Sequence, residues 1–205
     1  MILKLIFLIP FSFSFISNDS PLSSFSKKWT DEKYAVANTA ANAAYMNSEE
    51  REVIHILNLL KMDPQLFLNT VVLSYPAHTG DPSLKKNPYF ISLVKDLKNA
   101  KPMKVLTPDE KIYASAECHA ISSGSSGYVG HDRLNASCKK STAYYGECIS
   151  YGHDGALDIV MALLIDKNVP GVGHRKIFLT DYKTVGVSIK PHSRYRNNAV
   201  IDFGY

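Results

Sequence analysis

The stretch that decides the fold lies in the C-terminal half of the chain. It contains four glycine-bearing segments, which read Gly130-His131-Asp132-Arg133, Gly146-Glu147-Cys148-Ile149-Ser150-Tyr151-Gly152, Gly173-His174-Arg175-Lys176 and Val185-Gly186-Val187-Ser188. Two histidines and a glutamate stand beside glycines, and only folding can bring them together. Histidine and carboxylate side chains that meet in a cleft can bind a divalent metal, relay a proton or stabilise the fold by hydrogen bonds.

Helix-start signals dominate the residues before this stretch. Asn47-Ser48-Glu49-Glu50 is a capping box, and Asp63-Pro64 predicts the start of a second helix. Thr107-Pro108-Asp109-Glu110 predicts a helix that runs to about residue 123, with Thr107 as its N-cap. Apolar residues and breakers predict further helical segments over 88–98, 155–168 and 173–179.

Strand signals are confined to the end of the chain. Residues 184–189 and 199–203 alternate or run apolar, which predicts two strands joined by a basic loop over 190–198. Helices that precede strands indicate an α+β fold rather than a parallel α/β sheet.

The N-terminus predicts export from the cell. Residues 1–17 place one lysine before an apolar run of about a dozen residues, which is the layout of a secretory signal peptide. An uncleaved membrane anchor is the alternative, but Pro10 interrupts the run, and a spanning helix needs roughly 20 apolar residues. Residues 18–46 are polar and lack a clear period, so we expect a linker there and a domain over 47–205. The mature protein would be secreted or held in the cell envelope, extracellular or periplasmic, without a transmembrane segment.

The charge of the chain is mild. The formal net charge is +4, and removing Lys4 with the signal peptide leaves +3. The basic residues are interpreted as scattered, with pairs such as Lys85-Lys86 and Lys139-Lys140 in solvated loops. Nucleic acid is therefore not an expected partner.

Three cysteines, Cys118, Cys138 and Cys148, allow at most one intramolecular disulfide. Cys138 and Cys148 flank a polar loop and could close a short ring. Cys118 could also pair with either of them, because it belongs to a helix expected to pack nearby. One disulfide does not make a disulfide scaffold, so the fold must depend on its hydrophobic core.

The order of the motifs resembles the CAP domain family (cysteine-rich secretory proteins, antigen 5 and pathogenesis-related 1; SCP-like extracellular proteins), in its bacterial-type branch. That family shows a loop histidine, then GENIxYG, a helix, GHRxxxL and a strand reading VGVG. The matching residues here are Gly130-His131, Gly146 to Gly152, Gly173-His174-Arg175 and Val185-Gly186-Val187. The resemblance covers about residues 47–205. It implies an α-β-α sandwich with a central twisted antiparallel sheet and a cleft on one side.

The resemblance also implies which residues line the cleft. The family places two histidines and two acidic residues there, which carry over to His131, His174, Glu147 and, less directly, Asp166. The chain departs from the family pattern at Cys148, where an asparagine is usual. It also departs in an extended segment, 166–172, before the second histidine.

The two histidines and Glu147 form a ligand set that suits zinc or another divalent metal, with an open position for water. The alternative is structural, in which Glu147 and the histidines only satisfy buried partners and Arg175 pairs with Asp181 or Asp202. Three functional interpretations stay open. The leading one is a non-enzymatic protein whose cleft takes a small apolar ligand, a lipid or an extracellular protein partner, with a weakly held metal. The second is a metal-assisted peptidase or esterase that uses His131, His174 and Glu147, and the third is a structural module.

Two other histidines are expected to lie outside this set. His119 falls on the inward side of its predicted helix, which is typical of a core histidine. His153 is expected to be exposed, beside Asp154 as a helix N-cap.

Overall fold

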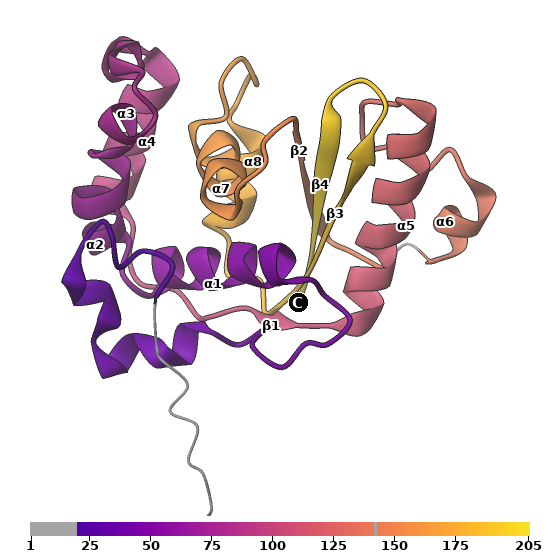
Figure 1. Ribbon diagram of the computed structural model, residues 1–205, viewed down its shortest axis with the longest axis horizontal. Helices are drawn as coiled ribbons and strands as arrows, with labels where there is room; N and C mark the ends of the chain where they lie inside the picture. The colour runs from indigo at the N-terminus through magenta and orange to yellow at the C-terminus, as the bar shows by residue number, and fades with distance from the viewer. Residues whose placement is uncertain (1–19, 142) are drawn as a thin grey trace, which may run out of the picture.

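The computed structural model describes residues 20–141 and 143–205 and has a mixed α/β fold centred on a four-stranded sheet (Figure 1). The strands are β1 (Thr107–Pro108), β2 (Gly146–Tyr151), β3 (Thr184–His192) and β4 (Arg196–Gly204). Their order in the sheet is β1-β3-β4-β2. Strands β3 and β4 form an antiparallel hairpin, and β2 pairs antiparallel with β4. Strand β2 therefore lies at one edge of the sheet.

Helical segments lie on both faces of this sheet. The α-helices are α1 (Ser48–Met62), α2 (Pro64–Phe67), α3 (Tyr75–His78), α4 (Pro88–Asn99), α5 (Glu110–Ser126), α6 (Ala136–Ser141), α7 (Ala156–Ile165) and α8 (Gly173–Phe178). Of these, α2, α3 and α4 lie farther from the sheet and pack against other helical segments (Figure 1). Shorter 3-10 or π segments are η1 (Lys27–Thr30), η2 (Glu32–Ala37), η3 (Leu68–Val72) and η4 (Pro82–Lys86). None of the helices in the described residues has both the length and the apolar character needed to cross a membrane.

Two of the expected helix starts are confirmed. The Asn47 side chain accepts from the Glu50 backbone, and Glu50 accepts from the Asn47 backbone, so both halves of the capping box are present. The Asp63 side chain caps α2, and Pro64 takes its first position. Local capping chemistry thus determines where both helices begin.

The expected antiparallel sheet is correct for three strands and wrong for β1, which runs parallel to β3. The Thr107 backbone N–H donates to the carbonyl of Lys183 at 2.8 Å, which keeps Thr107 and Pro108 extended. The expected N-cap at Thr107 is therefore wrong as well. Asp109 caps α5 instead, because its carboxylate accepts from the backbone N–H groups of the first turn.

Helix α5 covers one face of the sheet, while α1, α7 and α8 pack against the other (Figure 1). Helix α5 and strand β3 lie so close together that two positions at their contact require glycine. A Cβ atom on Gly186 would lie 2.2 Å from the Tyr113 backbone nitrogen, and one on Gly124 would lie 2.1 Å from the Pro191 carbonyl oxygen. The glycine of Val185-Gly186-Val187 thus allows the helix to approach the strand.

The β3–β4 hairpin is longer than expected. Residues 193–195 form its turn, so the predicted loop over 190–198 is mostly strand. Polar residues of β3 and β4 near the turn contact side chains of α5. The Lys190 ammonium lies 2.7 Å from the Glu117 carboxylate, and the Asn198 amide donates to the Ser123 hydroxyl at 2.9 Å. These partners explain how a polar sequence continues as strand.

The expected linker over 18–46 is wrong for its described part, residues 20–46, which packs against the domain. Leu22, Trp29 and Ala37 are buried in the main hydrophobic core. The Trp29 indole donates to the Thr70 hydroxyl at 3.0 Å. Apolar residues spaced around short 3-10 turns give no helical period, which hid this packing in the sequence. The expected signal peptide, residues 1–17, lies outside the described residues.

Candidate histidine–carboxylate site

His131 lies in the loop between α5 and α6 and contacts a buried glutamate. Its Nδ1 atom is 2.7 Å from the Oε1 atom of Glu147, which belongs to β2. The Glu147 side chain is 2% exposed, whereas the His131 side chain is 56% exposed. The imidazole therefore reaches solvent while its carboxylate partner stays inside the protein.

His174, in the first turn of α8, has the same kind of partner. Its Nδ1 atom is 2.7 Å from the Oδ1 atom of Asp166, whose side chain is 1% exposed. The other oxygen of Asp166 accepts from the His174 backbone N–H at 3.0 Å. Asp166 ends α7 in the left-handed region, with φ of 56°, so this helix stops before the predicted residue 168. That conformation turns the chain back toward α8.

The two imidazole rings, called here the histidine pair, lie side by side with centroids 6.1 Å apart. The structure thus brings together all four residues that the resemblance carried over. Each Nδ1 atom faces a carboxylate, so in the neutral ring the proton lies on Nδ1 and the lone pair on Nε2. Among residues 20–141 and 143–205, neither Nε2 atom has a hydrogen-bond partner. The pair therefore offers two lone pairs to a ligand.

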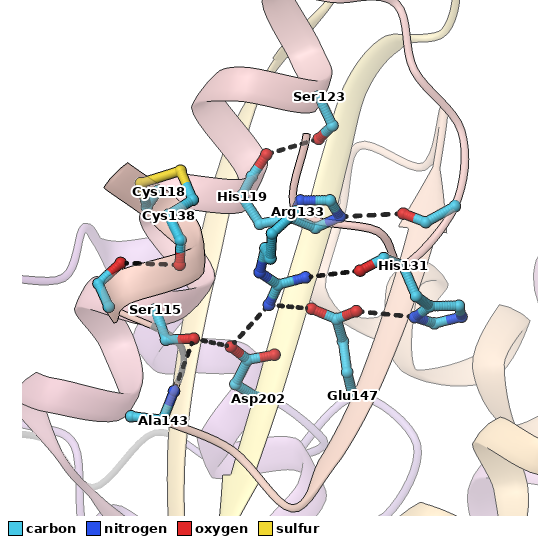
Figure 2. A network of polar contacts seen from close by, with 12 residues as sticks. Ser115, Cys118, His119, Ser123, His131, Arg133, Cys138, Ala143, Glu147 and Asp202 are labelled. Carbon is cyan, nitrogen blue, oxygen red and sulfur yellow. Dashed lines mark hydrogen bonds and ion pairs between the residues drawn. A yellow bond between two sulfur atoms is a disulfide. The ribbon is translucent and has the colours of Figure 1, made fainter. Parts of the chain in front are cut away.

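A buried network lies behind His131, formed by Ser115, Arg133, Glu147 and Asp202 (Figure 2). The Arg133 guanidinium contacts the second oxygen of Glu147 and lies 3.3 Å from Oδ2 of Asp202. It also donates to the His131 carbonyl at 3.1 Å. The Ser115 hydroxyl donates to Asp202 at 2.7 Å. Arg133 thus fixes both the glutamate and the loop that carries His131.

Arg133 and Asp202 were not among the predicted site residues, although the sequence held a signal for each. Arg133 stands two residues after His131 within the first quoted motif. Asp202 interrupts an apolar strand, and strand alternation places it on the same face as Glu147, its partner in the β2–β4 register. A carboxylate in a central apolar strand needs a hydrogen-bond or charge partner, so Asp202 itself indicates a buried polar cluster at this point of the sheet.

The pKa values of the two buried carboxyl groups in the network shift in opposite directions. Burial raises the pKa of Asp202 to about 8, and the nearby Glu147 charge adds to the effect. Burial also opposes ionisation of Glu147, but hydrogen bonds from His131 and Arg133 outweigh it and lower the Glu147 pKa. The hydrogen bond to Glu147 raises the pKa of His131. Near neutral pH, Glu147 is therefore ionised while Asp202 holds a proton.

Arg175 anchors the helix that carries His174. Each of its five N–H donors has an acceptor: the carbonyls of Leu164, Ile165 and Tyr89, the Ser92 hydroxyl and the Asp96 carboxylate. The expected pairing with Asp181 or Asp202 is wrong, since the carboxylate partner is Asp96 at 2.8 Å. The guanidinium joins α8 to α4 and to the end of α7, which places His174 beside Asp166.

Of the pairings that the sequence left open, Cys138–Cys148 is wrong and Cys118–Cys138 is confirmed, since Cys118 on α5 is bonded to Cys138 on α6. Cys148 is free and buried in the core on the opposite face of the sheet. Alternation along β2 turns Glu147 and Ile149 toward α5 and Cys148 away from it. The disulfide closes a chain segment that includes His131 and Arg133.

His119 and His153 lie outside the histidine pair. His119 is buried and its Nε2 atom bonds the Gly130 carbonyl at 2.9 Å, so the core interpretation is confirmed. His153 is half-buried rather than exposed, and bonds the Ser150 hydroxyl. The predicted N-cap at Asp154 is wrong, because Gly155 takes that position and Asp154 forms an ion pair with Arg196.

The expected three-ligand set does not fit the geometry. Both oxygens of Glu147 are engaged, one by His131 and one by Arg133. Within residues 20–141 and 143–205, no group of three or more His, Cys, Asp or Glu side chains is arranged to hold a metal. The arrangement suits two imidazole ligands, with the carboxylates orienting them from behind.

Comparison of the chain with protein-family models, with curated proteins and with solved structures gives no match.

Proposed function

We propose that the protein is an exported, CAP-like binding protein that presents the histidine pair in a cleft between the layers of an α-β-α sandwich. Its ligand would be a small apolar molecule, a lipid or an extracellular protein partner. The observation that carries the proposal is the duplicated arrangement of a solvent-reaching imidazole bonded to a buried carboxylate, with the two rings 6.1 Å apart.

A weakly held divalent metal is part of the proposal. His131 and His174 would supply the two protein ligands, and solvent or the bound partner would complete the coordination sphere. Zinc accepts neutral imidazole and usually takes four ligands, so two protein ligands imply modest affinity. Glu147 and Asp166 would act by orienting the rings.

The hydrolase alternative has less support. A metal-assisted hydrolase needs a group that can take a proton from the attacking water. Glu147 was the candidate, but His131 and Arg133 already use its two oxygens. Binding is therefore the better-supported function, and catalysis would need a group supplied from elsewhere.

Calorimetric titration with zinc tests the proposal. Wild-type protein should bind at one saturable site, and the His131→Ala/His174→Ala variant should lose that binding. A matched control, His78→Ala/His153→Ala, removes two imidazoles outside the pair and should bind as wild type does. Glu147→Gln should weaken binding by about 10–100-fold, because the ring loses its orienting carboxylate.

Two results would defeat the proposal. Unchanged zinc binding by His131→Ala/His174→Ala would place the site elsewhere. If the double variant only lost stability and wild type bound no zinc, the cluster would be a structural module.

A further inference from the structure

Residues 81–106, called here the lysine segment, carry the whole formal charge of the protein. The chain has 23 Lys and Arg and 19 Asp and Glu, of which six lysines and two aspartates lie in this segment. The remaining residues hold 17 of each sign and are neutral. The basic residues are thus concentrated rather than scattered, contrary to the sequence interpretation. The lysines are Lys85, Lys86, Lys95, Lys98, Lys101 and Lys104.

These charges are not compensated locally. All six lysines are exposed, and none forms an ion pair with another residue in the described part of the chain. Both aspartates of the segment already have partners. Asp81 accepts from the Ser83 backbone and hydroxyl, and Asp96 pairs with Arg175. The segment therefore presents a positive field to solvent.

Helix α4 gives this segment two distinct faces. Its inner stripe is buried in the core and consists of Phe90, Leu93 and Leu97. Ile91, Lys95 and Lys98 follow at i, i+4 and i+7 and share the outer face. Ile91 is 55% exposed. The outer face of α4 thus offers one apolar side chain beside the ammonium groups of Lys95 and Lys98, a combination that can contact both the acyl boundary and the headgroups of an anionic membrane.

The positively charged surface of the lysine segment continues past the C-terminal end of α4. An open hollow of about 420 Å³ lies there, and Lys95, Lys101 and Met103 are among its lining residues. In Figure 1, α4 lies on the side of the molecule away from α5 and the β3–β4 hairpin. None of the six lysines bonds to the histidine pair or to its carboxylates. The surface is therefore separate from the candidate site.

We propose that the lysine segment docks the protein onto an anionic membrane surface. All six cations are lysines, which act as flexible point charges and suit a diffuse layer of anionic headgroups. A site built for one phosphate group would more often use the bidentate fork of arginine. Exposed Ile91 favours a lipid surface over a soluble polyanion, because an apolar side chain gains nothing from a hydrated polymer.

Vesicle co-sedimentation of the full protein tests this proposal. Mixed phosphatidylcholine–phosphatidylglycerol vesicles should bind the protein, and pure phosphatidylcholine vesicles should not. The variant Lys95→Gln/Lys98→Gln/Lys101→Gln/Lys104→Gln should lose at least about tenfold in affinity, since each lysine near an anionic surface contributes substantially. The control Lys27→Gln/Lys28→Gln/Lys139→Gln/Lys140→Gln makes the same change in net charge at exposed positions elsewhere and should bind as wild type does.

Two further arms separate the alternatives. His131→Ala/His174→Ala should bind vesicles normally, so failure of the histidine-pair proposal would not affect this one. Ile91→Ser should weaken vesicle binding and leave binding to soluble polyphosphate unchanged. Equal loss in both lysine variants, or binding to polyphosphate without binding to vesicles, would overturn the proposal.

Discussion

At the scale of single residues, Asp202 has the most unusual chemistry. Its side chain is fully buried beside the ionised Glu147, and burial raises its pKa to about 8. An unfolded aspartate has a pKa near 3.9, so the folded protein binds more protons than the unfolded chain between about pH 4 and pH 8. The contribution of Asp202 to stability is therefore largest at acidic pH and is lost as pH rises through about 8.

Replacing Asp202 by asparagine should flatten this dependence. The amide keeps an acceptor for Ser115 and a donor toward Glu147, and it does not ionise. The free energy of unfolding of wild type should fall between about pH 5 and pH 8 by at least about 1 kcal/mol more than that of Asp202→Asn. Urea denaturation at both pH values measures the difference. Equal slopes in the two proteins would show that Asp202 is ionised throughout.

At the scale of elements, Arg175 decides how α8 is placed. Its five hydrogen bonds reach residues of α4 and the last turn of α7. A lysine at this position keeps the charge but has a single nitrogen with three donors. Arg175→Lys should therefore destabilise the protein by about 2–4 kcal/mol, because several buried carbonyls lose their donor.

Chemical denaturation compares this variant with Arg194→Lys. The Arg194 side chain is exposed and forms no hydrogen bond within residues 20–141 and 143–205. The control should stay within about 0.5 kcal/mol of wild type. A similar loss in both variants would contradict the anchoring role of Arg175.

The disulfide between α5 and α6 is the second contact that fixes how two helices are placed. It joins residues 20 apart in sequence and encloses the loop of His131 and Arg133. Cys118→Ser/Cys138→Ser should lower the free energy of unfolding by about 3 kcal/mol, as expected for a ring of this size. Peptide mapping of the denatured, unreduced protein should find Cys148 as the free thiol. A peptide linking Cys138 to Cys148 would contradict the structure.

At the scale of the whole molecule, the sequence predicted what local chemistry determines. The capping box at Asn47 and the Asp63 cap depend on neighbours within one turn, and both are confirmed. The start of α5 was misplaced, because a tertiary hydrogen bond from Thr107 to the Lys183 carbonyl determines the strand before it. Residues 20–46 were misread since their core contacts follow no regular period.

The candidate site shows the same division. The motif order led to His131, Glu147, Asp166 and His174, and the fold brings these four together. Their roles depend on contacts that sequence spacing does not define, since Glu147 is shared with Arg133 rather than free to bind a metal. The disulfide pairing likewise depends on which face of β2 Cys148 occupies.

The central claim is that buried carboxylates fix the tautomer of both rings and leave their Nε2 atoms for a ligand. Nitrogen-15 NMR of the histidine rings during a zinc titration tests it most directly. His131 and His174 should carry the proton on Nδ1. His119 and His192 bond carbonyls through Nε2, so they should show the opposite tautomer and serve as internal controls. Among the Nε2 resonances, zinc should shift only those of His131 and His174. A neutral ring in the pair with its proton on Nε2, or zinc shifts confined to other histidines, would contradict the assignment.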